Sequence, residues 1–486
     1  MLGALAGAAL ILPAPAWAGG PTTFTVNDNA AGSGPAGAAC TDADFATIQD
    51  AVDASSVGGT VLVCAGQYPE SVVVGNDLTL SGAQAGVDAR NRSGATGESV
   101  VTADEADEGG VSLMASGITL DGFVVANAAD PATSGTGIWL SPAEGNYLVT
   151  NNVVTDNTIG ISANNADGSP STISRNSFSD NNVAGSSGGT AIYGDSNVDD
   201  LTITQNEFSD QVNASVLLAG SGPAASNDNV TISDNTFSGT SGNPARNELR
   251  ILLLYTQNST ISGNTFDDMS NNAIQLADGN ANIAVTDNTI RDSGFAGVRI
   301  TDFGAAGENT GISVIGNTLT GGDTAINVAA DGHSGAITAS GNRIAGNTTG
   351  ILLNDADATV NASNNWWGCN EGPPNPGCDS VGGSDASDVT QSPVLTLSVN
   401  APAKIRKGKT KTITASINGG PSCQFPDGTA ITFATERGIL GGTTSLTQNC
   451  QATTSLTAKG ARGPVVVSAT LDNETVTDTV KFKKKK

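Results

Sequence analysis

The sequence predicts an all-β protein made of a long parallel β-helix, which is a solenoid of stacked coils, followed by a β-sandwich. Three observations predict this fold class. A short phrase recurs through the middle of the chain, each copy combines several short strand patterns, and the C-terminal part shows alternating strands with regular turns in place of the repeat. A repeat of this kind indicates stacked units rather than one globular core.

The chain begins with an apolar stretch of signal-peptide length. Residues 1–18 combine an apolar core with an A-x-A cleavage motif at Ala16 to Ala18, although they lack the usual positive charges before the core. This stretch is too short for a stable membrane span, and no later segment is apolar enough. We therefore expect a signal peptide at 1–18, a lead-in at 19–40 and a soluble mature chain without a transmembrane segment, secreted or held at the cell surface.

The repeated phrase, for example TISRNSFSDN at 172–181, is centred on an Asn that returns every 23 to 30 residues. A β-branched or small residue stands three positions before it, and a large apolar residue stands two positions after it. Asn tolerates left-handed backbone angles at a bend, and stacked Asn amides can satisfy otherwise buried groups. We expect a structural ladder, rather than a catalytic set, from Asn152, Asn176, Asn206, Asn235, Asn264, Asn288, Asn317, Asn342 and Asn365.

A second short strand recurs 14 to 19 residues before the next Asn, with alternating apolar positions. Its outward middle positions are Trp139, Ser162, Tyr193, Leu217, Leu252, Gln275, Arg299, Asn327 and Leu352. Aromatic faces stack on sugars and Arg pairs with carboxylates, so one interpretation is a glycan-binding strip. That strip would use Trp139, Tyr193, Gln275, Arg299 and Asp302. The other interpretation is a mixed exterior face partly covered by loops.

An Asp column accompanies the phrase, four residues after the Asn, and includes Asp156, Asp180 and Asp210. Two interpretations stay open. Carboxylate oxygens suit calcium, so the column is a candidate metal site and calcium the one cofactor to consider. Exposed Asp residues also form Asx-turns beside a bend, and no dense D-x-D-x-D loop accompanies the column.

Six cysteines fit an oxidising compartment. Their proximity in the sequence suggests three disulfides, although six cysteines allow fifteen pairings. Zinc is disfavoured because no C-x₂-C motif occurs and His333, placed here in a surface turn, is the single histidine. The expected pairs are Cys40 with Cys64, Cys369 with Cys378, and Cys423 with Cys450.

Over residues 41–380 the chain resembles the right-handed parallel β-helix (pectin-lyase-like) superfamily. The stretch from FATIQDAV to GQYPESVVV, residues 45–74, resembles the opening of pectinesterase-like proteins. Phe45, Ile48, Ala51 and Val52 lie on one face of a short helix suited to cover the open end of the coils. The segment NNWWGCNEGPPNPGC, 364–378, resembles the closing segment of bacterial surface β-helix proteins, where Trp residues cover the last coil.

A polar linker is expected at 381–393, and residues 394–483 resemble a bacterial immunoglobulin-like domain of the invasin and intimin type. The resemblance implies a spacer or adhesive module without catalysis. A basic tail follows at 484–486. Net charge is uneven: residues from Lys404 onward carry +8, whereas the preceding part carries −34. The acidic body argues against nucleic acid as a partner, and the basic end fits either an anionic envelope polymer or a solvated tail.

Two function classes follow from these features. The favoured one is a non-catalytic rod that binds a polysaccharide or cell-envelope glycan, or displays an adhesive surface. The alternative is a polysaccharide lyase or glycoside hydrolase acting on acidic polysaccharide. Lyases of this fold use Lys or Arg as the base, and no Lys precedes Lys404. Arg stays protonated far above neutral pH, and the hydrolase motifs are only partly matched, so no catalytic residue is predicted.

Overall fold

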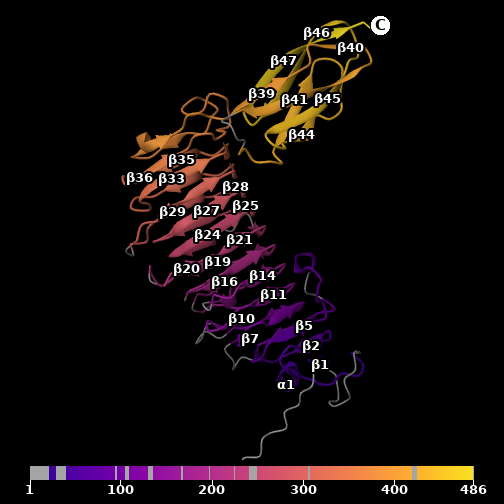
Figure 1. Ribbon diagram of the computed structural model, residues 1–486, viewed down its shortest axis with the longest axis vertical. Helices are drawn as coiled ribbons and strands as arrows, with labels where there is room; N and C mark the ends of the chain where they lie inside the picture. Colours follow the sequence, from indigo (N-terminus) through magenta and orange to yellow (C-terminus); the bar gives the residue numbers. More distant parts are fainter. Residues whose placement is uncertain are drawn as a thin grey trace, which may run out of the picture.

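The computed structural model describes residues 21–28, 40–92, 96–103, 109–129, 135–165, 168–185, 187–195, 197–223, 225–239, 249–304, 307–418 and 424–484. The expected signal peptide, Cys423 and residues 485–486 lie outside these ranges. The molecule is a rod in which three parallel sheets wind together and a β-sandwich sits at one end (Figure 1). In the part described, no helix is long and apolar enough to cross a membrane.

Sheet A is the largest of the three parallel sheets, and its strands follow the order of the chain. In order along the sheet they are β1 (Thr23–Val26), β2 (Gly59–Val63), β5 (Leu78–Ser81), β8 (Thr119–Asp121), β11 (Leu148–Thr150), β14 (Ser171–Ser174), β17 (Leu201–Thr204), β21 (Thr231–Ser233), β24 (Thr256–Ser262), β27 (Ala281–Thr286), β30 (Ser313–Ile315), β33 (Gly335–Ser340), β36 (Ala358–Asn361) and β38 (Val389–Thr390), with β20 (Asn227–Asp228) paired to β24.

Sheets B and C complete each coil. Sheet B contains β3 (Gly66–Tyr68), β6 (Ser99–Thr102), β9 (Phe123–Ala126), β12 (Val153–Thr155), β15 (Ser177–Ser179), β18 (Glu207–Ser209), β22 (Thr236–Ser238), β25 (Thr265–Met269), β28 (Thr289–Ser293), β31 (Thr318–Thr320) and β34 (Arg343–Ala345). Sheet C contains β4 (Val72–Val74), β7 (Gly109–Leu113), β10 (Thr136–Leu140), β13 (Ile159–Ala163), β16 (Thr190–Gly194), β19 (Ala214–Ala219), β23 (Leu249–Leu254), β26 (Ile274–Ala277), β29 (Ala296–Thr301), β32 (Thr324–Val328), β35 (Thr349–Leu353) and β37 (Val381–Gly382).

The Asn column forms the predicted ladder at the turn between sheets A and B. All nine side chains are buried, and the amide nitrogens of the first eight each donate to the amide oxygen of the next coil, at 2.9–3.1 Å. The same oxygen also accepts a backbone N–H, as Asn235 Oδ1 does from Asn206 N at 2.9 Å. The ladder therefore supplies the partners that buried turn amides need.

One detail of this turn differs from the expectation. The left-handed residue is the one before the ladder Asn, for example Arg175 and Gln205, and Gly263, Gly316 and Gly341 take that place in later coils. The ladder Asn itself is free for hydrogen bonding because its neighbour makes the bend. The Asp column makes a second left-handed turn, after sheet B: Asp156, Asp180 and Asp210 have φ of 57°, 52° and 58°.

The core runs the length of the coils and is closed at both ends. Phe178, Phe208, Phe237 and Phe266 stack in sheet B with ring centroids 4.6–4.9 Å apart. At the N-terminal end, helix α1 (Ile48–Ala54) begins after the N-cap Thr47 and buries three side chains against the first strands, as expected for a cap. Two 3₁₀ turns, η1 (Ala89–Asn91) and η2 (Ala386–Asp388), lie in connections.

The expected boundaries differ from the observed elements at two places. The lead-in 19–40 contains β1, which pairs with β2 and so opens sheet A. The linker expected at 381–393 contains β37 and β38, which pair with β35 and β36. Strands β37 and β38 have only two residues each, too few for an alternating pattern to be visible in the sequence.

The C-terminal part folds as two antiparallel sheets with an apolar core, in the manner of an immunoglobulin-like sandwich. One sheet contains β39 (Thr396–Asn400), β41 (Thr410–Asn418), β45 (Gln451–Thr457) and β43 (Ile439–Leu440). The other contains β40 (Lys404–Arg406), β47 (Glu474–Lys483), β46 (Gly463–Leu471), β42 (Ala430–Thr435) and β44 (Thr444–Leu446), and its β40–β47 pair is parallel.

The hairpin turn between β46 and β47 is one of the contacts that hold the sandwich to the last coil; another is the pair of hydrogen bonds between Asn370 and Leu397 of β39. Asp472, between β46 and β47, accepts hydrogen bonds from Arg343 Nε at 3.0 Å and from Trp366 Nε1 at 2.7 Å. Trp367 packs in the β-helix core, as expected for a closing residue, whereas Trp366 belongs to the core of the sandwich. Two adjacent Trp residues thus anchor two different cores.

Two of the expected disulfides are present, Cys40–Cys64 and Cys369–Cys378. Cys423 lies outside the described residues, so its pairing with Cys450 stays a prediction. The expectation of a surface His333 is wrong: the residue is fully buried, and its backbone N–H donates to Asp355 at 2.8 Å. The Gly residues around His333 correctly indicate a turn, but the turn packs against the neighbouring coils and so buries the side chain.

Candidate functional site

The outward positions predicted for the second strand of each repeat form one row on sheet C. Strand register aligns Val73, Ser112, Trp139, Ser162 and Tyr193. The same row continues through Leu217, Leu252, Gln275, Arg299, Asn327 and Leu352. Residues paired in register on neighbouring parallel strands face the same side of the sheet, so the row lies on one face, although Ser162, Leu252, Gln275 and Asn327 are buried there.

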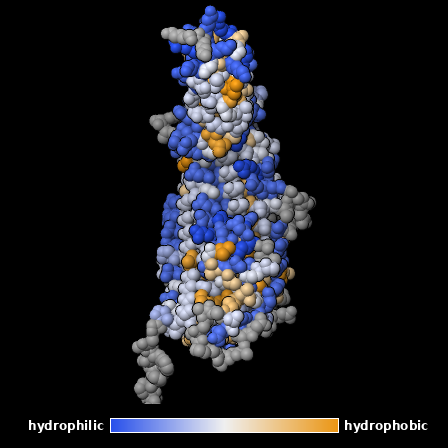
Figure 2. All heavy atoms as spheres, turned by 90° about the vertical axis from the view of Figure 1, so that its right-hand side faces the viewer, coloured by the Kyte–Doolittle hydropathy of each residue, from blue (hydrophilic) through white to orange (hydrophobic). Residues whose placement is uncertain are grey.

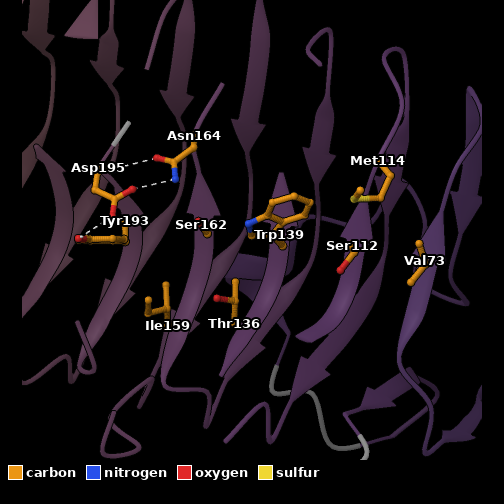
Figure 3. Close-up of a pocket in the computed structure, with 10 residues that line it drawn as sticks. All are labelled: Val73, Ser112, Met114, Thr136, Trp139, Ile159, Ser162, Asn164, Tyr193 and Asp195. Carbon is orange, nitrogen blue, oxygen red and sulfur yellow. Dashed lines mark hydrogen bonds between the residues drawn. The ribbon is translucent and has the colours of Figure 1, made fainter. Parts of the chain in front are cut away.

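The N-terminal half of this row is hollowed into a groove of about 590 Å³. Its walls come from β4, β7, β10, β13 and β16 and from the turns that follow them. Figure 3 shows the indole of Trp139 and the ring of Tyr193 projecting from the sheet with Ser162 between them. The groove is lined by Val73, Ser112, Met114, Thr136, Trp139, Ile159, Ser162, Asn164, Tyr193 and Asp195.

One end of the groove is a fixed polar wall. Asn164 and Asp195, which follow β13 and β16, exchange two hydrogen bonds of 2.8 and 2.9 Å. The Tyr193 hydroxyl donates to Asp195 Oδ2 at 3.2 Å. The pKa of the Tyr193 hydroxyl is raised, mainly because the side chain is partly buried. A hydrogen bond with Ser187 lowers this pKa, and the nearby Asp195 carboxylate raises it further.

The C-terminal half of the row is a separate place. Leu217 and Leu252 interrupt the polar side chains, and Gln275 lies three strand spacings, about 14 Å, beyond Tyr193. Gln275 is 3% exposed and accepts from Asn272 Nδ2 at 2.8 Å. The Arg299 guanidinium stacks over Phe295 at 4.9 Å, and burial lowers its pKa. The expected strip is therefore one row of residues in register, but it divides into two separate surfaces: the groove with Trp139 and Tyr193, and the part with Gln275 and Arg299.

Asp302 belongs to a carboxyl pair that the sequence did not indicate. Asp278, at the end of β26, is buried and its pKa is raised, first by burial and then by a hydrogen bond with Asp302. The same hydrogen bond lowers the pKa of Asp302. Asp278 also accepts from the backbone N–H of Phe303 at 2.7 Å. This hydrogen bond joins the turns that follow β26 and β29 in sheet C.

The candidate calcium residues lie apart from both surfaces. Asp156, Asp180 and Asp210 follow β12, β15 and β18, and so form a column at the edge of sheet B. Within the described part of the chain, the single group of three or more potential metal ligands is Cys369, Glu371 and Cys378. Its two cysteines are joined in a disulfide, which removes their thiolates as ligands.

Sequence reasoning found Trp139 and Tyr193, because they occupy the outward position of recognisable repeats. It missed Val73, Met114, Asn164 and Asp195. Val73 lies in the first coils, before the Asn phrase begins, and the other three lie in turns rather than at strand centres. Asn164 and Asp195 could have been found from the sequence, because each is a polar residue directly after a sheet C strand, β13 and β16, in successive coils.

Comparisons with known proteins agree with this architecture. The family model described as the right handed beta helix region matches residues 67–237 and 186–333, which overlap and together span more than half of the chain. No curated protein matches the chain.

Among solved structures, the D0-D1 domain of intimin is 22% identical, with a TM-score of 0.15, over 18% of this chain and 47% of that one. A mutant of a periplasmic alginate epimerase is 11% identical, with a TM-score of 0.33, over 63% of this chain and 61% of that one. An alginate lyase from Paenibacillus is 12% identical, with a TM-score of 0.36, over 64% of this chain and 95% of that one. The chain thus spans less than two thirds of the first two proteins.

Proposed function

Because the chain belongs to the right-handed β-helix family, whose scaffold serves many functions, we propose its function from the groove on sheet C. The groove binds a glycan without cleaving it. The observation that carries this proposal is the placement of Trp139 and Tyr193 on one face of the sheet, with the small hydroxyl side chain of Ser162 between them.

The spacing of the two aromatic side chains supports a carbohydrate ligand. Trp139 and Tyr193 lie two coils apart, about 9.6 Å at the usual strand spacing, which suits a short run of sugar rings laid along the rod. Aromatic rings offer an apolar face for the ligand, and the polar groups of Ser112, Ser162 and Asn164 offer hydrogen bonds.

Charge favours a neutral glycan over an acidic one. Asp195 is the one charged residue among the ten that line the groove, and the body before Lys404 carries −34. An acidic polysaccharide would meet repulsion from both. The two disulfides fit an extracytoplasmic location, so we place this glycan binding outside the cytoplasm, on a secreted or surface-held protein.

The same lining favours binding over catalysis. Most glycosidases use two carboxyl groups across the scissile bond, and the groove offers Asp195 alone. Tyr193 is a poor base because its pKa is raised. The alternative, a lyase or hydrolase acting on acidic polysaccharide, is supported by an Arg and a carboxyl pair on adjacent strands: Arg299 lies on β29, and Asp278 and Asp302 follow β26 and β29.

The test measures binding and cleavage together. Residues 19–486 are titrated with neutral and acidic oligosaccharides by calorimetry, and new reducing ends are assayed in parallel. We expect affinity for a neutral oligosaccharide to fall about tenfold in Trp139→Ala and in Tyr193→Ala, from lost stacking.

Phe303→Ala is the matched control, since Phe303 is an exposed aromatic residue outside the groove. It should leave affinity unchanged. Unchanged affinity in Trp139→Ala would contradict the proposed site. New chain ends that disappear in Arg299→Ala would replace the binding function by catalysis at the second surface.

A further inference from the structure

The end of the sandwich that points away from the β-helix carries a concentrated positive charge. The side chains that form it come from β40, β41, β47 and the loops beside them, and all are exposed. Hydrophilic atoms gather at this upper end of the rod in Figure 2. We call this surface the basic end; it contains Lys404, Arg406, Lys407, Lys409, Lys411, Lys459, Arg462, Lys481, Lys483 and Lys484.

Strand pairing brings these charges together rather than letting them disperse. In the parallel pair of β40 and β47, Lys404 lies opposite Lys481 and Arg406 lies opposite Lys483. Neighbouring strands are about 4.8 Å apart, so these like charges repel one another. None of the ion pairs among the described residues includes a member of the basic end. An external anion placed at the basic end would relieve this repulsion.

Three of the five acidic residues from Lys404 onward, Asp427, Asp472 and Glu474, lie toward the β-helix, whereas Glu436 and Asp478 lie nearer the basic end. Asp472 and Glu474, at the turn between β46 and β47, contact the last coil through Arg343 and through the backbone N–H of Asn370. The hairpin is long, and its register places Lys481 opposite Pro464 at the far end from that turn. Charge is therefore separated along the rod: a strongly acidic body, a neutralised junction and the basic end.

We infer that the basic end docks on a phosphate-bearing anionic lipid surface, with the rod standing upright on it. A flat anionic surface touches the blunt tip alone, whereas the acidic body is pushed away from it. A long soluble polyanion would instead extend beside the acidic body and be repelled there, which is why a surface fits better than a polymer. Each Lys or Arg held at an anionic membrane contributes about a fivefold increase in affinity.

The test uses sedimentation of residues 19–486 with vesicles of phosphatidylcholine containing increasing fractions of phosphatidylglycerol. Binding should need the anionic lipid and weaken steeply with added salt. The double variant Lys481→Gln with Lys483→Gln should bind about thirtyfold more weakly. Arg175→Gln with Arg291→Gln removes the same charge from exposed positions on the β-helix and should bind at least as well as the unchanged protein.

Three results would overturn the inference. One is an absence of binding to anionic vesicles at low salt, and another is an equal loss in both double variants. The third is tighter binding to double-stranded DNA than to the vesicles at the same ionic strength, which would make the partner a linear polyanion. Reflectometry of the bound layer tests the upright pose: a layer as thick as the rod is long supports it, and a thin layer contradicts it.

Discussion

The β-helix and the sandwich solve the same packing problem in different ways. The β-helix buries a column of nine Asn side chains beside its apolar core, whereas the sandwich core cluster is made of apolar side chains, together with Trp366 from the last coil. A coil turns sharply three times, and its turn amides cannot reach solvent. The sandwich joins its strands through surface turns, whose backbone groups need no buried partners.

This difference teaches that the two regions depend on different kinds of residue. In the β-helix each coil is supported by hydrogen bonds from the next, so one polar side chain serves two coils. In the sandwich the same role falls to apolar packing between two sheets. Replacing a buried Asn by an apolar residue should therefore destabilise the β-helix, whereas replacing a buried apolar residue by a polar one should destabilise the sandwich.

The largest expected effect comes from the middle of the Asn ladder. Asn235→Ala removes the acceptor of Asn206 and the donor to Ile203 and Asn264, all buried. We expect the free energy of unfolding of the β-helix to fall by about 4 kcal/mol. Guanidinium unfolding followed by circular dichroism measures this, with Asn418→Ala, exposed on β41, as the neutral control. Equal stability of both variants would show that the ladder is not required.

Much of this comparison was predictable from the sequence, because both the ladder and the outward row follow a repeat that is readable residue by residue. What was not predictable depends on contacts between repeats. Asp278 meets Asp302 only when two turns stack, and the sequence does not show that Trp366, unlike Trp367, packs in the core of the sandwich. The groove itself needs the early coil of Val73, which lies outside the recognisable phrase.

The junction between the two regions should give the next largest effect. Arg343→Ala leaves Asp472, which is largely buried, without its cationic partner. We expect a loss of about 2 kcal/mol and a wider separation of the β-helix and sandwich transitions. Arg291→Ala breaks an exposed pair with Asp267 and should cost less than about 0.5 kcal/mol. Matching losses in the two variants would mean that the junction is not coupled to either fold.

Acidification should change the stability of the β-helix in a defined direction. Burial raises the pKa of Glu98, Asp278 and Asp379 above ordinary values, so the folded state holds these protons more tightly than the unfolded state. Stability therefore increases as pH falls from 7 toward the ordinary values of 4.5 and 3.8, and it is lost as pH rises through the raised pKa values. Unfolding midpoints at pH 7 and pH 5 check this sign.

The smallest expected effect is that of Asp156→Gly in the Asp column. Asp156→Gly keeps the left-handed turn and should change stability by less than about 0.5 kcal/mol, whereas Asp156→Val, which disfavours that conformation, should cost about 2 kcal/mol. Thermal unfolding measures both. Repeating it with calcium separates the two interpretations of the column. A calcium-dependent rise in Tm that is lost on replacing Asp156, Asp180 and Asp210 by Gly would establish a metal site.

The Asn ladder also has an electrical consequence. Every link in it runs the same way, from the amide nitrogen of one coil to the amide oxygen of the following coil. The strands run across the rod axis, so their dipoles contribute little along it, whereas these side-chain dipoles add along the axis. The positive pole of the Asn ladder faces the last coil. The ladder and the basic end therefore both make the sandwich end of the rod more positive than the opposite end.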